Sequence, residues 1–346
     1  MKTQLLKFRQ HFLEALLDML WKQWSALGVA GYGEVRNHYV ADPEALLLFT
    51  CSIGRYDQRL FDEMLDWLDK NERFISIQRL RMILSKEQFS SGNILGAVAA
   101  HMAQKNLTPK WRRLADAQKH SRKKSACENL FFLKNGDPMP QPKENDKIFM
   151  QYGYIRNPLQ NRGLSLAFRS KLPQSLLLQM RSLFGIGART ETLLYLFLNG
   201  KASISQIAVE TYYSWRSIQN VLFEMGYSGQ LYFPEAKRGR FYRLDGKPWL
   251  DILLGRECND VKWLRWPPLF RSLEMIWEKL NSNGFQALSP LAQAVEFQTL
   301  MREETSPRLE HAGLGSINMA LNVSVNNVDY LEVFQRNIDE IFKMIS

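Results

Sequence analysis

Residues 214–243 combine polar, basic and aromatic side chains in an order that suits recognition of another molecule. Arg216, Gln219 and Asn220 follow Trp215 near the start of one predicted helix, and all four should face outward. The apolar residues of this helix recur at i, i+4 and i+7 and should pack inward: Ile218, Leu222 and Met225. Arg, Gln and Asn are the side chains that hydrogen-bond the edges of guanine and adenine in the major groove. The pattern therefore indicates a helix that reads DNA bases.

The same region carries a second, basic group of residues. Ser214 is a favourable N-cap for the predicted helix. The hairpin expected after the helix carries four cations with only Glu235 against them: Lys237, Arg238, Arg240 and Arg243. Lys and Arg side chains neutralise phosphates without reading sequence. We therefore predict these DNA-binding residues: Ser214, Trp215, Arg216, Gln219, Asn220, Lys237, Arg238, Arg240 and Arg243.

A compact unit over residues 189–244 should position these side chains. Three helices and then two strands are expected in this order: 189–198, 203–210, 215–225, 230–233 and 240–244. Ser203 and Gln206 are spaced as a capping box, and Gly226 closes the third helix. The two strands are joined by residues 234–239, which hold the Pro and the Gly that a tight connection needs. This order predicts a winged helix-turn-helix domain with a small β-hairpin wing.

Three local features of this unit match one family. They are the Ser-rich second helix, the Met-Gly-Tyr sequence at 225–227 and the Phe-Tyr-Arg-Leu sequence at 241–244. With these features, the unit resembles winged-helix transcriptional regulators of the arsenic-repressor and multiple-antibiotic-resistance type. The resemblance implies that residues 215–220 enter the major groove and that residues 237–243 touch phosphate. Metal-sensing members carry Cys or His ligands on their helices, and residues 189–244 contain neither, so we expect no metal site.

Length and composition set bounds on the rest of the chain. Its 346 residues should form two or three domains, and 45% hydrophobic residues supply ample core. The three cysteines show no disulfide or zinc pattern, which fits a reducing cytoplasm. Charged residues interrupt the apolar start, so we expect no signal peptide, and no apolar run is long enough to predict a membrane span. We therefore expect a cytoplasmic protein with no membrane partner.

The net charge of +10 is concentrated in one segment. Residues 105–190 hold 17 basic and 5 acidic side chains, whereas residues 1–104 hold 12 of each. Eight of the basic residues cluster together: Lys105, Lys110, Arg112, Arg113, Lys119, Arg122, Lys123 and Lys124. Such local density is typical of a surface that contacts phosphates, and the alternative is a solvated basic linker.

We expect a mainly α protein with four regions. They are a helical N-terminal domain, a basic and partly irregular connecting segment, the winged helix-turn-helix domain and a helical C-terminal domain: 1–104, 105–180, 181–248 and 249–346. The first region is interpreted as a dimerisation or docking module, or alternatively as a second helix-turn-helix that presents Arg79 and Arg81. In the connecting segment, the β-like runs 129–133 and 148–154 predict an irregular hairpin. The apolar stripe of the last helix, 330–345, is either core or a dimer contact.

No pattern for catalysis is present in the sequence. None of the five His residues lies within four residues of another His or of a Cys, and no phosphate-binding loop or nucleophile motif occurs. The acidic residues of one predicted helix are interpreted as solvated surface: Asp62, Glu63, Asp66 and Asp69. We therefore expect neither an enzyme nor a cofactor.

These observations together predict a DNA-binding transcriptional regulator. Its winged helix would read a half-site in double-stranded DNA while the basic segment contacts phosphates. Because one reading helix covers only a half-site, we expect a homodimer on a palindrome. Whether the regulator also binds an effector ligand or a protein partner stays an open question. The alternative is a replication initiator or a partner-docking protein that uses the winged helix for assembly.

Overall fold

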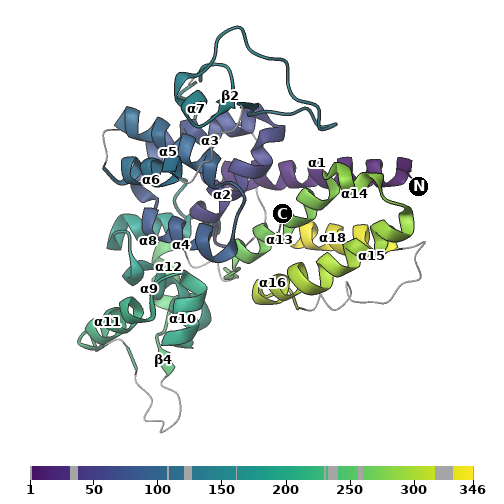
Figure 1. Cartoon of the computed structure of the whole chain (residues 1–346). Coiled ribbons are helices and arrows are strands. Elements are labelled where there is room, and N and C mark those ends of the chain that lie inside the picture. The colour runs from purple at the N-terminus through teal and green to yellow at the C-terminus, as the bar shows by residue number, and fades with distance from the viewer. Residues whose placement is uncertain are drawn as a thin grey trace.

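The computed structural model of this chain is mainly helical, as the sequence predicts (Figure 1). The structure describes residues 2–31, 38–106, 109–120, 127–160, 162–229, 231–232, 241–255, 260–315 and 330–345. In Figure 1, the helices of residues 188–226 lie below the N-terminal helices, and the helices of residues 283–345 lie to the right, beside the first helix.

Helices α1 to α6 form the N-terminal part of the fold. Their bounds are Lys2–Ala26 (α1), Pro43–Ile53 (α2), Gln58–Asn71 (α3), Ile77–Glu87 (α4), Gly92–Asn106 (α5) and Pro109–His120 (α6), with short turns of 3-10 helix at Gly54–Tyr56 (η1) and Glu72–Phe74 (η2). Asp42 caps α2 by accepting a hydrogen bond from the N–H of Ala45 at 3.0 Å, and Pro43 takes the first helical position. Asp57 and Ser76 cap α3 and α4 in the same way.

The connecting segment differs from the predicted irregular hairpin. Helix α6 occupies its basic start. The two β-like runs do not form a hairpin, because β1 (Glu128–Asn129) pairs in parallel with β2 (Tyr154–Ile155). Helix α7 (Lys147–Gln151) takes up part of the second run, since Asp146 caps it by accepting hydrogen bonds from two backbone N–H groups. The segment ends in the 3-10 turn η3 (Pro173–Ser175) and continues into α8 (Leu176–Phe184).

The three helices predicted after residue 188 are confirmed. The elements here are α9 (Ala188–Asn199), β3 (Lys201–Ser203), α10 (Ile204–Thr211), α11 (Trp215–Gly226) and β4 (Phe241–Arg243). Ser203 and Gln206 form the expected capping box, in which each side chain bonds the backbone of the other residue. Ser214 caps α11 as predicted, and its hydroxyl accepts from the N–H of Ser217 at 3.1 Å.

The strands of this unit form a small sheet. Strand β3, which was not predicted, pairs antiparallel with β4, so that Ala202 lies opposite Tyr242. Tyr232 pairs antiparallel with Arg243 on the other edge of β4, with backbone hydrogen bonds of 3.0 and 3.2 Å. Gln230 and residues 233–240, which include most of the predicted hairpin, lie outside the described residues.

The C-terminal helices pack mainly on the N-terminal part. Their bounds are Lys247–Leu254 (α12), Trp266–Leu280 (α13), Asn283–Ala287 (α14), Pro290–Leu300 (α15), Ser306–His311 (α16) and Tyr330–Ile345 (α18), with a π-helical turn at Met301–Thr305 (η4). Two hydrophobic clusters are seen among the described residues. The first joins α1–α6 with α13–α18, and the second joins α8–α12 with the small sheet. Most of the regions predicted at 1–104 and 249–346 therefore share one core.

Helix α18 illustrates this shared core. The ring of Phe334 lies 5.4 Å from that of Phe8 on α1, and the ring of Phe342 lies 6.0 Å from that of Phe12. Ile338 of the same stripe is also buried. The prediction of α18 as a dimer contact is therefore wrong for these side chains, because α1 of the same chain already covers them.

Candidate nucleic-acid interface

Helix α11 places its polar residues on an open face. Ser214, Trp215, Arg216, Gln219 and Asn220 are all exposed, and half of the Trp215 surface is accessible. On the opposite face, the apolar residues predicted to pack inward are fully or largely buried: Ile218, Leu222 and Met225. The structure therefore brings the five predicted residues of this helix together on one surface.

The exposed face of α11 also carries aromatic residues that sequence reasoning missed. Phe223 and Tyr227 are 65% and 80% exposed, and their rings meet edge to face at 5.3 Å. Both continue the spacing of four residues from Trp215 through Gln219, so one stripe runs along the helix. The i+4 repeat signals this stripe in the sequence. Such exposed aromatic residues are a usual mark of a surface that contacts another molecule.

The predicted wing is described only at its base. Arg243 is exposed at the end of β4, beside Tyr232 on the neighbouring chain segment. Lys237, Arg238 and Arg240 lie outside the described residues. Their predicted contacts with DNA therefore stay predictions.

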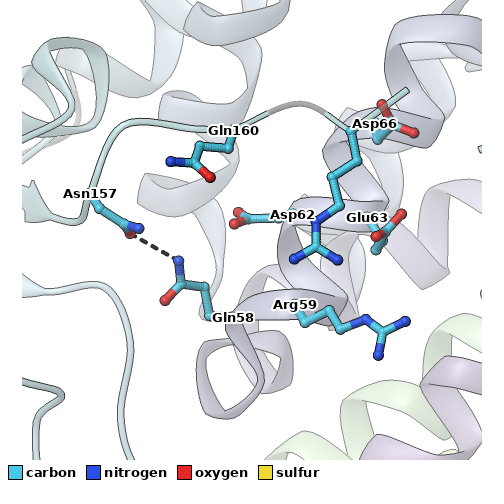
Figure 2. A pocket seen from close by; sticks show the side chains of 8 residues that line it. Gln58, Arg59, Asp62, Glu63, Asp66, Asn157 and Gln160 are labelled. Atoms are coloured by element: carbon cyan, nitrogen blue, oxygen red, sulfur yellow. Dashed lines mark hydrogen bonds between the residues drawn. The ribbon is translucent and has the colours of Figure 1, made fainter. Parts of the chain in front are cut away.

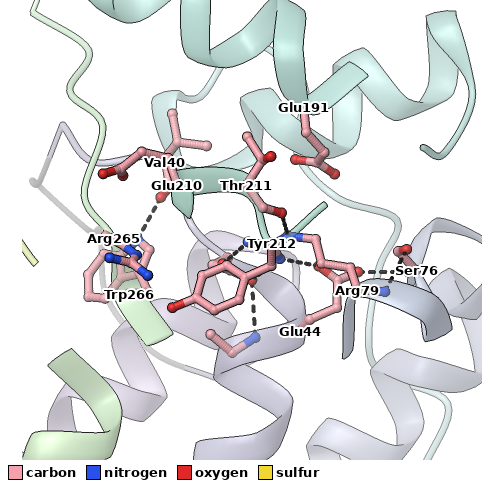
Figure 3. Close-up of polar contacts among 12 residues, drawn as sticks. Val40, Glu44, Ser76, Arg79, Glu191, Glu210, Thr211, Tyr212, Arg265 and Trp266 are labelled. Atoms are coloured by element: carbon pink, nitrogen blue, oxygen red, sulfur yellow. Dashed lines mark hydrogen bonds and ion pairs between the residues drawn. The ribbon is translucent and has the colours of Figure 1, made fainter. Parts of the chain in front are cut away.

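Tyr212 anchors the turn between α10 and α11 in the first hydrophobic cluster. Figure 3 shows this residue beside Arg265. Tyr212 ends α10 in the left-handed conformation, with a φ of 62°, and its side chain is fully buried. Its hydroxyl donates a hydrogen bond to the carboxylate of Glu87 on α4. The guanidinium carbon of Arg265 lies 5.1 Å from the centre of its ring. Because a buried tyrosine with paired polar contacts resists movement, this turn fixes the start of α11.

Arg79 of α4 connects the turn to buried carboxylates (Figure 3). Its guanidinium donates to Asp42 at 2.7 Å, to Glu44 at 2.8 Å and to the backbone carbonyl of Thr211 at 3.0 Å. The predicted presentation of Arg79 at the surface is therefore wrong, because these acceptors hold it in the interior. Arg81, two residues later, is exposed.

A second buried arginine extends this network to α9. Arg181 on α8 donates to Glu44 at 2.6 Å and to Glu191 at 3.0 Å. Burial raises the pKa of Glu191, although Arg181 opposes the shift. Burial also disfavours the charge of Asp42, yet the neighbouring guanidinium of Arg79 holds the pKa of Asp42 below its usual value. The network joins α2, α4, α8 and α9, so it holds the α9–α11 unit against the helical body.

The basic segment forms a helix with an exposed cationic side. Two of its lysines are paired, Lys105 with Asp69 and Lys110 with Glu72 at 2.8 Å. The exposed charged residues of α6 are three cations and one acid: Arg112, Arg113, Lys119 and Asp116. Arg122, Lys123 and Lys124 lie outside the described residues. The described residues of this basic cluster therefore lie on folded helices and not on a solvated linker.

The acidic residues of α3 are not the solvated surface that the sequence predicted. Glu63 and Asp66 are buried, and most of the Asp69 side chain is covered. The carboxylate of Asp66 accepts hydrogen bonds from the backbone N–H groups of Gly163 at 2.9 Å and Ser165 at 2.7 Å. The distant segment around residue 165 covers this face of α3, and nothing near α3 in the sequence signals that contact.

Three of the acidic residues, Asp62, Glu63 and Asp66, line a cleft of about 350 Å³ (Figure 2). Asp62 pairs with the buried Arg156 at 2.8 Å, and Gln58 donates to the side chain of Asn157 at 2.9 Å. Burial raises the pKa of Asp62 and of Glu63, and for Glu63 the charge of the adjacent Asp66 adds to the effect. The cleft is polar, and most of its carboxylates form hydrogen bonds or ion pairs with other groups of the protein. No group of three or more potential metal ligands is found among the described residues.

Comparison with known protein families, with curated proteins and with solved structures found no match for this chain. Across the described residues, the helices are either too short or too polar to cross a membrane.

Proposed function

We propose that residues 188–244 form a winged helix-turn-helix that binds double-stranded DNA, and that the protein is a transcriptional regulator. One observation carries this proposal. Arg216, Gln219 and Asn220 lie together on the exposed face of α11, while Ile218 and Leu222 bury the opposite face. A helix with exposed Arg, Gln and Asn side chains can hydrogen-bond base edges in a major groove.

Three further observations support the proposal. The antiparallel contacts of β4 with β3 and with Tyr232 are those expected at the base of a wing. The buried network at Arg79 and Arg181 holds α11 in one orientation, which base reading requires because hydrogen bonds are directional. The exposed cations of α6 suit contacts with phosphates.

A single α11 reads one half-site, so we propose a homodimer on a palindrome. Its contact uses a surface other than the buried stripe of α18. The proposed regulator acts on cytoplasmic DNA and needs no cofactor.

The exposed pair Phe223 and Tyr227 favours a second candidate function. In this candidate the same face of α11 docks a protein partner, as in a replication initiator that assembles through its winged helix. Aromatic residues are enriched where proteins meet, because they bury a large area with few rotatable bonds.

The proposal predicts that the full chain binds duplex DNA and that binding weakens steeply with salt. Fluorescence anisotropy with a labelled duplex of about 30 base pairs measures this, since each neutralised phosphate makes the slope of log K against log salt more negative by about 0.9. A Phe223→Ser, Tyr227→Ser variant should still bind DNA if these residues serve a protein partner. A folded full chain without affinity for any duplex at low salt would contradict the DNA-binding proposal and leave the docking candidate.

A further inference from the structure

Helix α4 lies directly against the turn that precedes α11. Arg79 Nε donates to the backbone carbonyl of Thr211 at 3.0 Å. Lys86 Nζ lies 5.7 Å from the centre of the Tyr212 ring. Ser214, the N-cap of α11, follows this turn closely. Helix α4 therefore borders the start of the proposed recognition helix.

On another side, α4 borders the basic helix α6. Near the end of α4, Leu84 and Gln118 of α6 both approach Gly92. Near its start, Lys110 Nζ donates at 2.7 Å to the backbone carbonyl of Glu72 in the preceding turn. The two helices therefore run side by side.

Between these two contacts, α4 has an exposed polar face. The exposed side chains of α4 are Gln78, Arg81, Ser85 and Lys86. Within the described residues, the ion pairs of α4 involve Arg79 and Glu87. Among the described residues, no carboxylate forms an ion pair with Arg81 or Lys86, so both carry positive charge at the surface. A basic surface of this kind attracts a polyanion.

Extending the DNA-binding function proposed above, we propose that the exposed face of α4 contacts the phosphate backbone of the same duplex. Helix α4 itself contacts α6, which presents Arg113, and the turn before α11, which presents Arg216. Arg81 and Lys86 bind phosphates, and Gln78 can add a neutral hydrogen bond.

The test compares full-length variants in the salt dependence of their binding to a labelled duplex of about 30 base pairs. Arg81→Gln with Lys86→Gln should make the negative slope of log K against log salt less steep by about 2, since two phosphate contacts are lost. Arg302→Gln with Lys343→Gln makes the same change of charge at exposed positions on η4 and α18, and it should leave the slope unchanged. Arg81→Lys should keep the wild-type slope, because a cation remains. Thermal unfolding of each variant checks that the fold is intact.

Each result either supports or overturns the contact of α4 with phosphates. A smaller slope in the α4 variant, with the control unchanged, supports the contact. Wild-type binding with equal slopes in both variants would overturn it and leave the proposed function standing. Equal reductions in both variants would also overturn it, because net charge alone would then explain the effect. If the wild-type chain binds no duplex, the proposed function and this extension fail together.

Discussion

At the scale of single residues, burial of charge has the clearest energetic consequences. Glu63 is buried beside Asp66 in the wall of the acidic cleft, and one of its carboxylate oxygens has no hydrogen-bond partner among the described residues. Burial and the neighbouring carboxylate raise the pKa of Glu63 above its ordinary value of 4.5. The folded protein therefore disfavours the charged form of this side chain.

Replacement of Glu63 by Gln should stabilise the protein at neutral pH and have little effect near pH 4. As pH rises from 4.5 towards the raised pKa, the unfolded chain releases the proton of Glu63 while the folded chain keeps it. The wild-type protein thus loses stability across this window, and the Gln variant does not. Thermal unfolding measured from pH 4 to pH 7 should show the Tm difference growing with pH. A difference that stays constant or shrinks would show that Glu63 is not disfavoured as an anion.

At the scale of elements, Glu44 is the residue on which several helices depend. Its carboxylate accepts hydrogen bonds from Arg79, from Arg181 and from the N–H of Ser76 at 2.7 Å. These partners bring α4 and α8 onto α2, and through Glu191 they include α9. The α9–α11 unit is therefore held by buried polar contacts as well as by apolar packing.

Glu44→Ala should destabilise the folded chain by about 3–5 kcal/mol, because two buried guanidinium groups lose a shared partner. Glu304→Ala provides the matched control, since it removes an exposed partner of Arg308 at 2.8 Å and should cost about 0–1 kcal/mol. Denaturant unfolding of both variants measures the difference. Similar small effects in the two variants would mean that Glu44 is not central to the attachment of α9.

Local features of the elements could be predicted from the sequence, whereas contacts between distant residues could not. The caps at Ser203 and Ser214 and the exposed face of α11 were predicted correctly, because each depends on residues within one or two turns of the chain. The burial of Arg79 and Tyr212 could not be predicted, since their partners are distant in sequence. Strand β3 has only three residues, too few to give an alternating pattern.

At the scale of the whole molecule, the chain is organised around two hydrophobic clusters that share a polar boundary. Helix α18 packs on α1, so the first and last helices of the chain both contribute to the first cluster. Periodicity along α18 predicts that its stripe is buried but does not identify the partner. Tyr212 belongs to the first cluster, whereas most of the α9–α11 unit belongs to the second. This arrangement presents α11 on a rigid support, as sequence-specific reading of DNA requires.

Selection from a random duplex library tests whether α11 reads DNA bases. The full-length protein should enrich a short motif. Arg216→Ala with Asn220→Ala should still bind DNA through phosphates but should lose preference for part of that motif, because each good base contact contributes about 1–3 kcal/mol of discrimination. Arg302→Ala with Lys343→Ala, remote from α11, should enrich the wild-type motif. Enrichment of no motif by the wild-type protein, or of an unchanged motif by the α11 variant, would contradict the account.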